Sequence, residues 1–195
     1  MALDANKVYA PTPDQSTTTG AVAVAPTGTT APANATAALG SAWDDGGYVS
    51  EDGISVTITR TTTVLRDWSK SAVRTLLSEF AGTIGVNFLQ VDQFAAERVF
   101  GEDNVTVTAA TSSTGEKIKV AIGADLPPVE SWCFSMKDGD ARIRIYVPRG
   151  QITEVNQVDF KPDAGNVIGG KLTTYDDGTG NQIYFMYDDG TVVSG

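Results

Sequence analysis

The chain has 195 residues and a formal net charge of −10, from 24 acidic and 14 basic residues. Histidine is absent and Cys133 is the lone cysteine, which excludes Ser–His–Asp and Cys–His catalysis, an intrachain disulfide and the usual zinc sites. The surplus of carboxylates also argues against a protein that grips nucleic acid, because phosphate neutralisation needs an excess of Lys and Arg.

Residues 1–42 differ in composition from the rest of the chain. No charged residue occurs between Asp14 and Asp44, and Ala, Thr, Pro and Gly dominate the stretch. Such a segment buries too little apolar surface to fold alone. We predict an extended N-terminal arm over residues 1–42 and a β domain over residues 43–195. Two interpretations of the arm stay open: a disordered terminus, or a segment that becomes ordered on a neighbouring subunit.

From Ile54 onward, apolar residues recur with a period of two, which is typical of half-buried strands. In "ISVTITR" the residues Ile54, Val56 and Ile58 share one face. We expect "TTVLRDW" to follow, and then "AVRTLLSEF" and "GTIGVNFLQV" as two strands split at Gly82. Later runs that predict strands are "NVTVTA", "EKIKVAIG", "SWCFSMKD", "ARIRIYV", "ITEVNQVDF", "GKLTTYDD" and "QIYFMYDD". Strands at this close spacing indicate a mainly β protein, a sandwich or barrel.

Asp-Gly pairs mark several of the predicted turns, because Gly supplies the positive φ that a tight turn needs. The clearest hairpin is "MKDGDARI", around Asp138–Gly139. The Asp-rich loop "YDDGTGNQ" lacks the ordered ligand spacing of a calcium loop. Adjacent carboxylates in turns do not converge on one substrate, so we expect no enzyme, no metal and no cofactor.

The segment "VDQFAAERVFG" predicts the chain's one short α-helix, which flanks the β domain. Asp92 is a suitable N-cap and Gly101 a suitable stop. Phe94, Val99 and Phe100 lie on positions that can bury against a sheet.

Aromatic residues suggest two different environments. Trp132, Phe134 and Met136 alternate along one predicted strand and are assigned to the core. Trp68 sits beside the charged residues Arg66, Asp67 and Lys70. It is interpreted either as the cover of a core or as an anchor at an interface.

The order of elements resembles the tail tube (major tail) proteins of long non-contractile-tailed bacteriophages, particularly those of actinobacteria. The resemblance covers about residues 45–190 and rests on "GYVSEDGI", the Thr-rich strand after it, Trp68 with the following "VRT", and the short helix closed by "FG". The later segments "VNQVDFKP" and "LTTYDDGTGNQIYFMYDD" are similar to the late strands of that family. Longer relatives carry an additional immunoglobulin-like domain, which we do not expect here.

The resemblance implies a β-sandwich or barrel-like fold with a flanking helix and an arm that reaches the next ring. It implies hexameric rings stacked around a tape measure protein, with tail terminator and distal tail proteins as further partners. Viral DNA would pass through the channel without specific binding. The virion tail would be assembled in the host cytoplasm, with no membrane partner. Arg66, Trp68 and Lys70 are the candidate inter-ring contact.

Two alternatives remain at this level: another tube-forming or tail-terminator protein of the same fold, and a β-sandwich binding module. The acidic composition fits a channel that repels DNA phosphates. Tube formation by the purified protein is the expected behaviour, and deletion of residues 1–40 is expected to weaken stacking.

Overall fold

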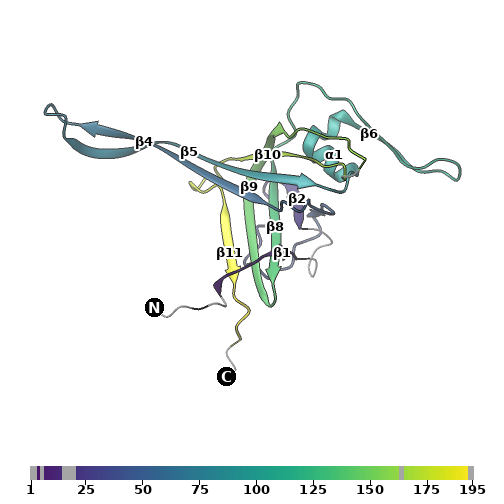
Figure 1. The fold of residues 1–195 in the computed structure, drawn as a ribbon, viewed down its shortest axis with the longest axis horizontal. Helices are drawn as coiled ribbons and strands as arrows, with labels where there is room; N and C mark the ends of the chain where they lie inside the picture. Colours follow the sequence, from purple (N-terminus) through teal and green to yellow (C-terminus); the bar gives the residue numbers. More distant parts are fainter. Residues whose placement is uncertain (1–3, 5–6, 15–20, 163–164, 193–195) are drawn as a thin grey trace.

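The computed structural model describes residue 4 and residues 7–14, 21–162 and 165–192 (Figure 1). This part of the chain is mainly β, as predicted, with one α-helix, α1 (Gln93–Phe100), and a 3-10 turn, η2 (Glu102–Asn104). The strands are β1 (Thr12–Pro13), β2 (Val22–Pro26), β3 (Asp44–Asp45), β4 (Ser55–Arg66), β5 (Ala72–Phe88), β6 (Val105–Thr108), β7 (Lys117–Val120), β8 (Glu130–Asp138), β9 (Ala141–Val155), β10 (Ile168–Thr174) and β11 (Tyr184–Asp188).

Nine of these strands form one antiparallel sheet in the order β3-β2-β8-β9-β10-β5-β4, with β1 added to β8 and β11 added to β9. Strand β9 is central in the sheet, because β8 pairs along one of its edges. Along the other edge, β11 pairs with the first part of β9 and β10 with the last part. In Figure 1, β4, β5 and β10 run across the molecule, whereas β8, β9 and β11 run down it. The sheet therefore folds into a sandwich-like arrangement, with β6 and β7 as a separate hairpin beside α1.

The hydrophobic core lies between the strands that run across the molecule and the strands that run down it, and helix α1 covers one end of it (Figure 1). Ile84, Val86 and Phe88 alternate along β5 and are buried, as the period of two predicts. Across the core, Trp132 and Phe134 of β8 are also buried. The remaining buried apolar residues of this cluster are Ala21, Val22, Val24, Ala95, Val99, Ile145, Val147, Ile152, Ile168 and Leu172.

Helix α1 covers one end of this core. Asp92 caps it, its side chain accepting a hydrogen bond from the Ala95 N–H at 2.9 Å. Val99 is buried, and the Phe94 ring meets Phe88 edge-on at 6.0 Å between centroids. No helix in the described part of the chain is long and apolar enough to cross a membrane.

The stretch around β2 differs from the expectation of an extended arm over residues 1–42. Val22 and Val24 are fully buried, and β2 pairs with β8 from Val22 to Pro26. A strand of small apolar residues without charge can lie in the middle of a sheet, where both of its faces are covered. These five residues belong to the β fold, while the boundary at residue 42 stays a prediction.

The predicted break at Gly82 is wrong, because β5 runs without interruption from Ala72 to Phe88. The glycine is used for close packing: a Cβ atom there would collide with the hydroxyl of Thr174, which donates a hydrogen bond to the Gly82 carbonyl at 3.0 Å. Likewise, "ARIRIYV" and "ITEV" belong to one strand, β9. The predicted hairpin at Asp138–Gly139 is confirmed, with Asp138 paired to Ala141 and Gly139 at a φ of 57°.

Candidate assembly surface

The most prominent feature outside the core is a long hairpin formed by β4 and β5. Strand β10 pairs with β5 only from Thr83 to Phe88, so residues 58–82 have no third strand beside them. We call residues 58–82 the hairpin arm. Figure 1 shows it extending to the left, well beyond the body of the molecule. The arm is therefore the part of the described chain best placed to reach another molecule.

Side-chain contacts between the two strands hold the arm in shape. Arg60 lies opposite Phe80, with its guanidinium carbon 5.4 Å from the ring centroid. Farther out, the hydroxyls of Thr63 and Ser78 are 3.0 Å apart. Cross-strand pairs of this kind stabilise a hairpin by roughly 0.2–1 kcal/mol each. The outer part of the arm therefore has a register defined by its own cross-strand contacts, while its base is held to β10 by the hydrogen bond from Thr174 to the Gly82 carbonyl.

The tip of the arm, residues 66–71, is organised by the carboxylate of Asp67. It accepts hydrogen bonds from the Ser69 hydroxyl at 2.7 Å and from the Ser71 N–H at 2.8 Å. The Ser69 hydrogen bond, followed by that of Ser71, holds the pKa of Asp67 below its usual value. Arg66 donates to the Lys70 carbonyl at 3.0 Å, and Lys70 adopts a positive φ of 64°. These hydrogen bonds thus give the turn at the tip a defined conformation.

Arg66, Trp68 and Lys70 are brought together at this tip. Trp68 is fully exposed, so it covers no core of its own chain. This exposure argues against the interpretation of Trp68 as the cover of a core, and the interpretation as an interface anchor stays a prediction. Its role in a contact remains a proposal.

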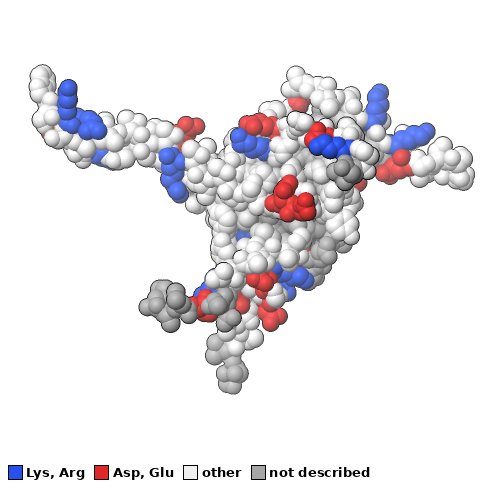
Figure 2. All heavy atoms as spheres, in the orientation of Figure 1, with Lys and Arg blue, Asp and Glu red and all other residues white. Residues whose placement is uncertain are grey.

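The arm differs from the rest of the molecule in charge. It carries four cations, Arg60, Arg66, Lys70 and Arg74, against two carboxylates, Asp67 and Glu79, whereas the whole chain has a net charge of −10. Figure 2 shows basic side chains gathered at the end of the arm and acidic ones over the body. The arm is therefore a basic projection on an acidic subunit.

Exposed apolar side chains accompany these charges. Val64, Leu65, Val73 and Leu77 are all exposed on the arm, together with Trp68. A two-stranded hairpin is at best marginally stable in water, and a concentration of exposed apolar groups marks an interaction surface. The arm therefore exposes apolar side chains of the kind found at interaction surfaces.

Sequence reasoning found the tip but missed Leu65, Val73, Arg74 and Leu77, which lie along the arm. The sequence pattern around these residues, in which apolar and polar residues alternate, is the same as in any strand with one buried face. A signal was present in "TRTTT", residues 59–63, where the apolar alternation of Ile54 to Ile58 stops. Loss of the apolar face in mid-strand indicates that the strand has left the core.

The residues predicted for the flanking helix lie at the contact between α1 and the sheet. Phe94 and Val99 pack as described above, and Phe100 lies partly buried against the same cluster. Arg98 forms ion pairs with Glu130 at 2.8 Å and with Asp44 at 3.3 Å, and so links α1 to β8 and β3. Asp92, Phe94, Val99 and Phe100 thus fix the helix on the sheet.

The described residues include no group of three or more His, Cys, Asp or Glu side chains arranged to hold a metal ion. Burial raises the pKa of the Cys133 thiol to about 11, so the neutral thiol dominates at neutral pH.

A model of the family described as phage tail tube protein matches residues 1–194. The chain belongs to the phage tail tube protein family. No curated protein matches it at a significant level. As a tail tube protein it is a structural component of the bacteriophage virion tail and assembles with copies of itself into a tube. The match includes β2 and the whole hairpin arm, so both are parts of the tail tube subunit.

Proposed function

We propose that this subunit polymerises as stacked hexameric rings, and that the resulting tube is the conduit for DNA ejection into the host. The observation that carries the proposal is the hairpin arm, whose exposed apolar and basic residues need a partner. In this proposal the tip residues Arg66, Trp68 and Lys70 contact the adjacent ring. The protein acts by assembly and has no catalytic role.

The ends of the sheet support closure into a ring. Strand β4 lies at one end of the described sheet, and the two-residue strand β3 lies at the other. An edge strand presents unpaired N–H and C=O groups that invite pairing with another chain. In a closed ring these edges are paired between neighbouring subunits, and the sheet becomes a barrel shared by six chains.

The net charge suits a channel for DNA. A ring of six subunits would carry a formal charge of −60, six times the −10 of one chain. Carboxylates that face the bore repel phosphates over about 8 Å at physiological ionic strength, so the DNA slides without being held. The tape measure protein occupies the bore before ejection, the tail terminator and distal tail proteins close the ends, and the tail is assembled in the host cytoplasm.

Negative-stain electron microscopy of the concentrated, purified protein tests this function. The expected result is tubes of stacked rings with six-fold symmetry and a central channel. Single rings that never stack would indicate a tail terminator. A stable monomer under every assembly condition would overturn the proposal and favour a β-sandwich binding module.

A further inference from the structure

A groove lies at the end of β4 opposite the arm tip. It has a volume of about 500 Å³ and is formed by residues 11–13, Ala21, residues 49–54 and Met136. We call it the proximal groove. Its apolar walls include Pro13, Val49, Ile54 and Met136, and among the described residues that line it the charged ones are Glu51 and Asp52. It is an apolar hollow with an acidic border.

The acidic border is on a defined turn. The N–H of Gly53 donates to the Ser50 carbonyl at 3.0 Å, and Gly53 has a φ of 66°. Glu51 and Asp52 occupy the two central positions of this turn and are exposed. Ser50 is tied to the sheet by a hydrogen bond from its N–H to the Asn87 carbonyl at 2.8 Å. Both carboxylates are therefore presented at fixed positions beside the groove.

The arm tip has the complementary properties. It offers a fully exposed indole, Trp68, flanked by Lys70 and, on β5, by the exposed Arg74. An aromatic anchor that enters an apolar pocket with charged pairs at its border is the usual form of an interface hot spot. The tip, together with the neighbouring Arg74, therefore complements the proximal groove in polarity and in charge.

A chain cannot place its own tip in its own groove. Strand β4 separates the two and has 12 residues. At about 3.3 Å per residue, such a strand spans about 40 Å. The groove and the tip lie at its two ends, since residues 49–54 precede β4 and residues 66–71 follow it. The occupant of the groove must come from another molecule.

We propose that the arm tip of one subunit docks in the proximal groove of a second copy of this chain, with Trp68 among Val49, Ile54 and Met136. Lys70 and Arg74 then face Glu51 and Asp52. This inference rests on the proposed stacking of rings and names the surface on which the tip lands. A contact between two different surfaces of the same chain is heterologous, so repeated use of it generates either a closed ring or an open assembly, and the proposed stacking of rings corresponds to the open case.

Other hollows suit a basic tip less well. One contains Arg149 beside Asp177, and another contains Arg60 beside Asp176. In each, the cation weakens the attraction of the carboxylate for Lys70 or Arg74. A third hollow has no charged residue among its described lining, and a fourth has Asp125 as its one charged residue there but a volume of only about 130 Å³. The proximal groove combines about 500 Å³ with two carboxylates and no cation among its described lining residues, which favours it as the receptor.

Charge reversal on both sides of the contact tests the proposal in the full chain. We compare K70E/R74E at the tip, E51K/D52K at the groove, and the four-fold combination. Each pair alone is expected to raise the protein concentration needed for tube formation by about tenfold or more, because like charges then meet. The combination restores opposite charges and is expected to recover most of the loss.

The control variant is K117E/K119E, which makes on β7, away from both surfaces, the same charge change as K70E/R74E makes at the tip. It is expected to assemble like the wild type. Circular dichroism and thermal unfolding of each variant establish that the monomer folds, which is expected because all four substituted residues are exposed. Fluorescence gives an independent readout. The emission of Trp68, obtained by subtracting the spectrum of W68F from that of the wild type, is expected to shift to shorter wavelength on assembly.

The outcomes separate this inference from the proposed function. If the wild type forms tubes and both single-side pairs assemble normally, or if the combination is no better than either pair, the docking site is wrong and the function stands. If K70E/R74E loses binding to duplex DNA in a gel-shift assay while tube formation is unchanged, the tip contacts nucleic acid and the docking site is wrong. If the wild type forms no tubes, the proposed function fails first.

Discussion

Glu130 is a buried residue, 7% exposed, and its carboxylate forms an ion pair with Arg98 at 2.8 Å. Asp44, Glu97 and Glu102 lie near enough to act on its charge. Burial raises the pKa of Glu130 from 4.5 to about 7; Arg98 lowers it, and the neighbouring carboxylates raise it further. Between these two values the folded chain binds more protons than the unfolded chain. Stability is therefore lost as the pH rises from 4.5 through 7.

This linkage makes the stability difference between wild type and E130Q depend on pH. From about pH 5 to about pH 8, the wild type is expected to lose about 2–3 kcal/mol of unfolding free energy relative to E130Q. Urea unfolding at both pH values measures it. The control, E154Q, removes an exposed carboxylate paired with Lys171 and is expected to show little difference. A wild-type minus E130Q difference that does not change with pH would contradict the assignment.

Gly170 of β10 lies where two strands approach closely. A Cβ atom at this position would collide with the backbone carbonyl oxygen of Glu154, which is held in β9. Gly170→Ala is expected to reduce the unfolding free energy by about 2 kcal/mol, because the β9–β10 pairing must shift. Urea denaturation measures this against Gly115→Ala, where a Cβ atom meets nothing within 4 Å. Equal midpoints for the two variants would show that β10 accommodates the methyl group.

At the scale of elements, the hairpin arm can be separated from the fold. Thr59 pairs with Ala81, so residues 60–80 can be replaced by Asn-Gly, which forms a tight two-residue turn. The shortened chain is expected to unfold at nearly the wild-type temperature, since Ile84, Val86 and Phe88 remain in the core. Electron microscopy is expected to show no tubes.

The matched control shortens the other hairpin. Thr108 pairs with Lys117, so residues 109–116 can be replaced by Asn-Gly in the same way. This variant is expected to form tubes. Normal tubes from the arm deletion would remove the arm from the assembly surface. Failure of both variants would point to a general requirement for long hairpins.

Local sequence patterns predict some elements well. The helix from Gln93 to Phe100, the turn at Asp138–Gly139 and the buried alternation of Ile84, Val86 and Phe88 each follow from residues close in sequence. The hairpin arm follows from them only in part: the loss of the apolar face at residues 59–63 is a local signal, but where the third strand stops is not. The β10 pairing ends at Thr83, whose partner Thr173 lies 90 residues later in the chain.

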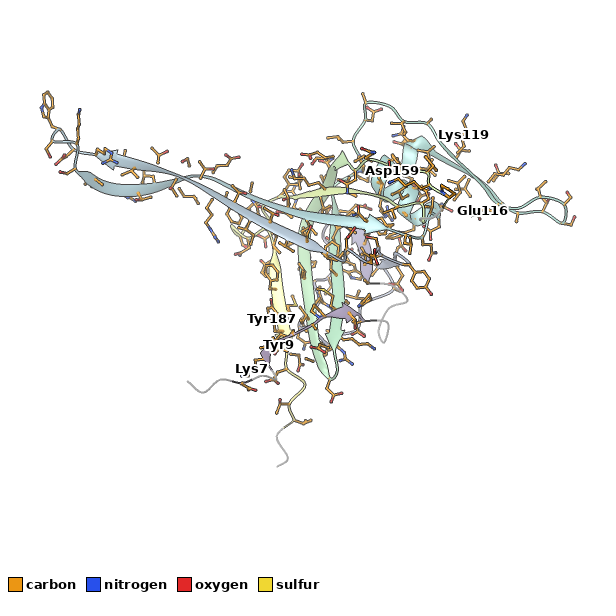
Figure 3. The ribbon with its side chains drawn as sticks, in the orientation of Figure 1. Lys7, Tyr9, Glu116, Lys119, Asp159 and Tyr187 are labelled. Carbon is orange, nitrogen blue, oxygen red and sulfur yellow. The ribbon has the colours of Figure 1, made fainter. Side chains whose placement is uncertain are left out.

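At the scale of the whole molecule, the N-terminal segment is tied to the body. Beyond the burial of β2, Tyr9 stacks on Tyr187 with ring centroids 6.3 Å apart, and Arg142 forms an ion pair with Asp14 at 3.2 Å. Figure 3 shows Tyr9 beside Tyr187, near Lys7. Segments from opposite ends of the sequence therefore support each other.

Deletion of residues 1–40 consequently has a different expected effect from weaker stacking alone. It removes β1 and β2, including the fully buried Val22 and Val24, and is expected to abolish cooperative unfolding in calorimetry. Deletion of residues 1–6, which leaves both strands, is expected to preserve it. A 1–40 deletion that folds normally and fails only to stack would instead support an independent arm over that range.

By itself, the sequence determined the β class, the short helix, the turns, the lack of histidine chemistry and the resemblance to tail tube proteins. Each depends on composition or on residues near one another in the chain. Only the tertiary structure decided that β2 lies in the core, that residues 58–82 leave it, and that the proximal groove opens at the far end of β4 from the arm tip. These depend on which distant strands pair, and strand pairing is a non-local choice that burial and register settle together.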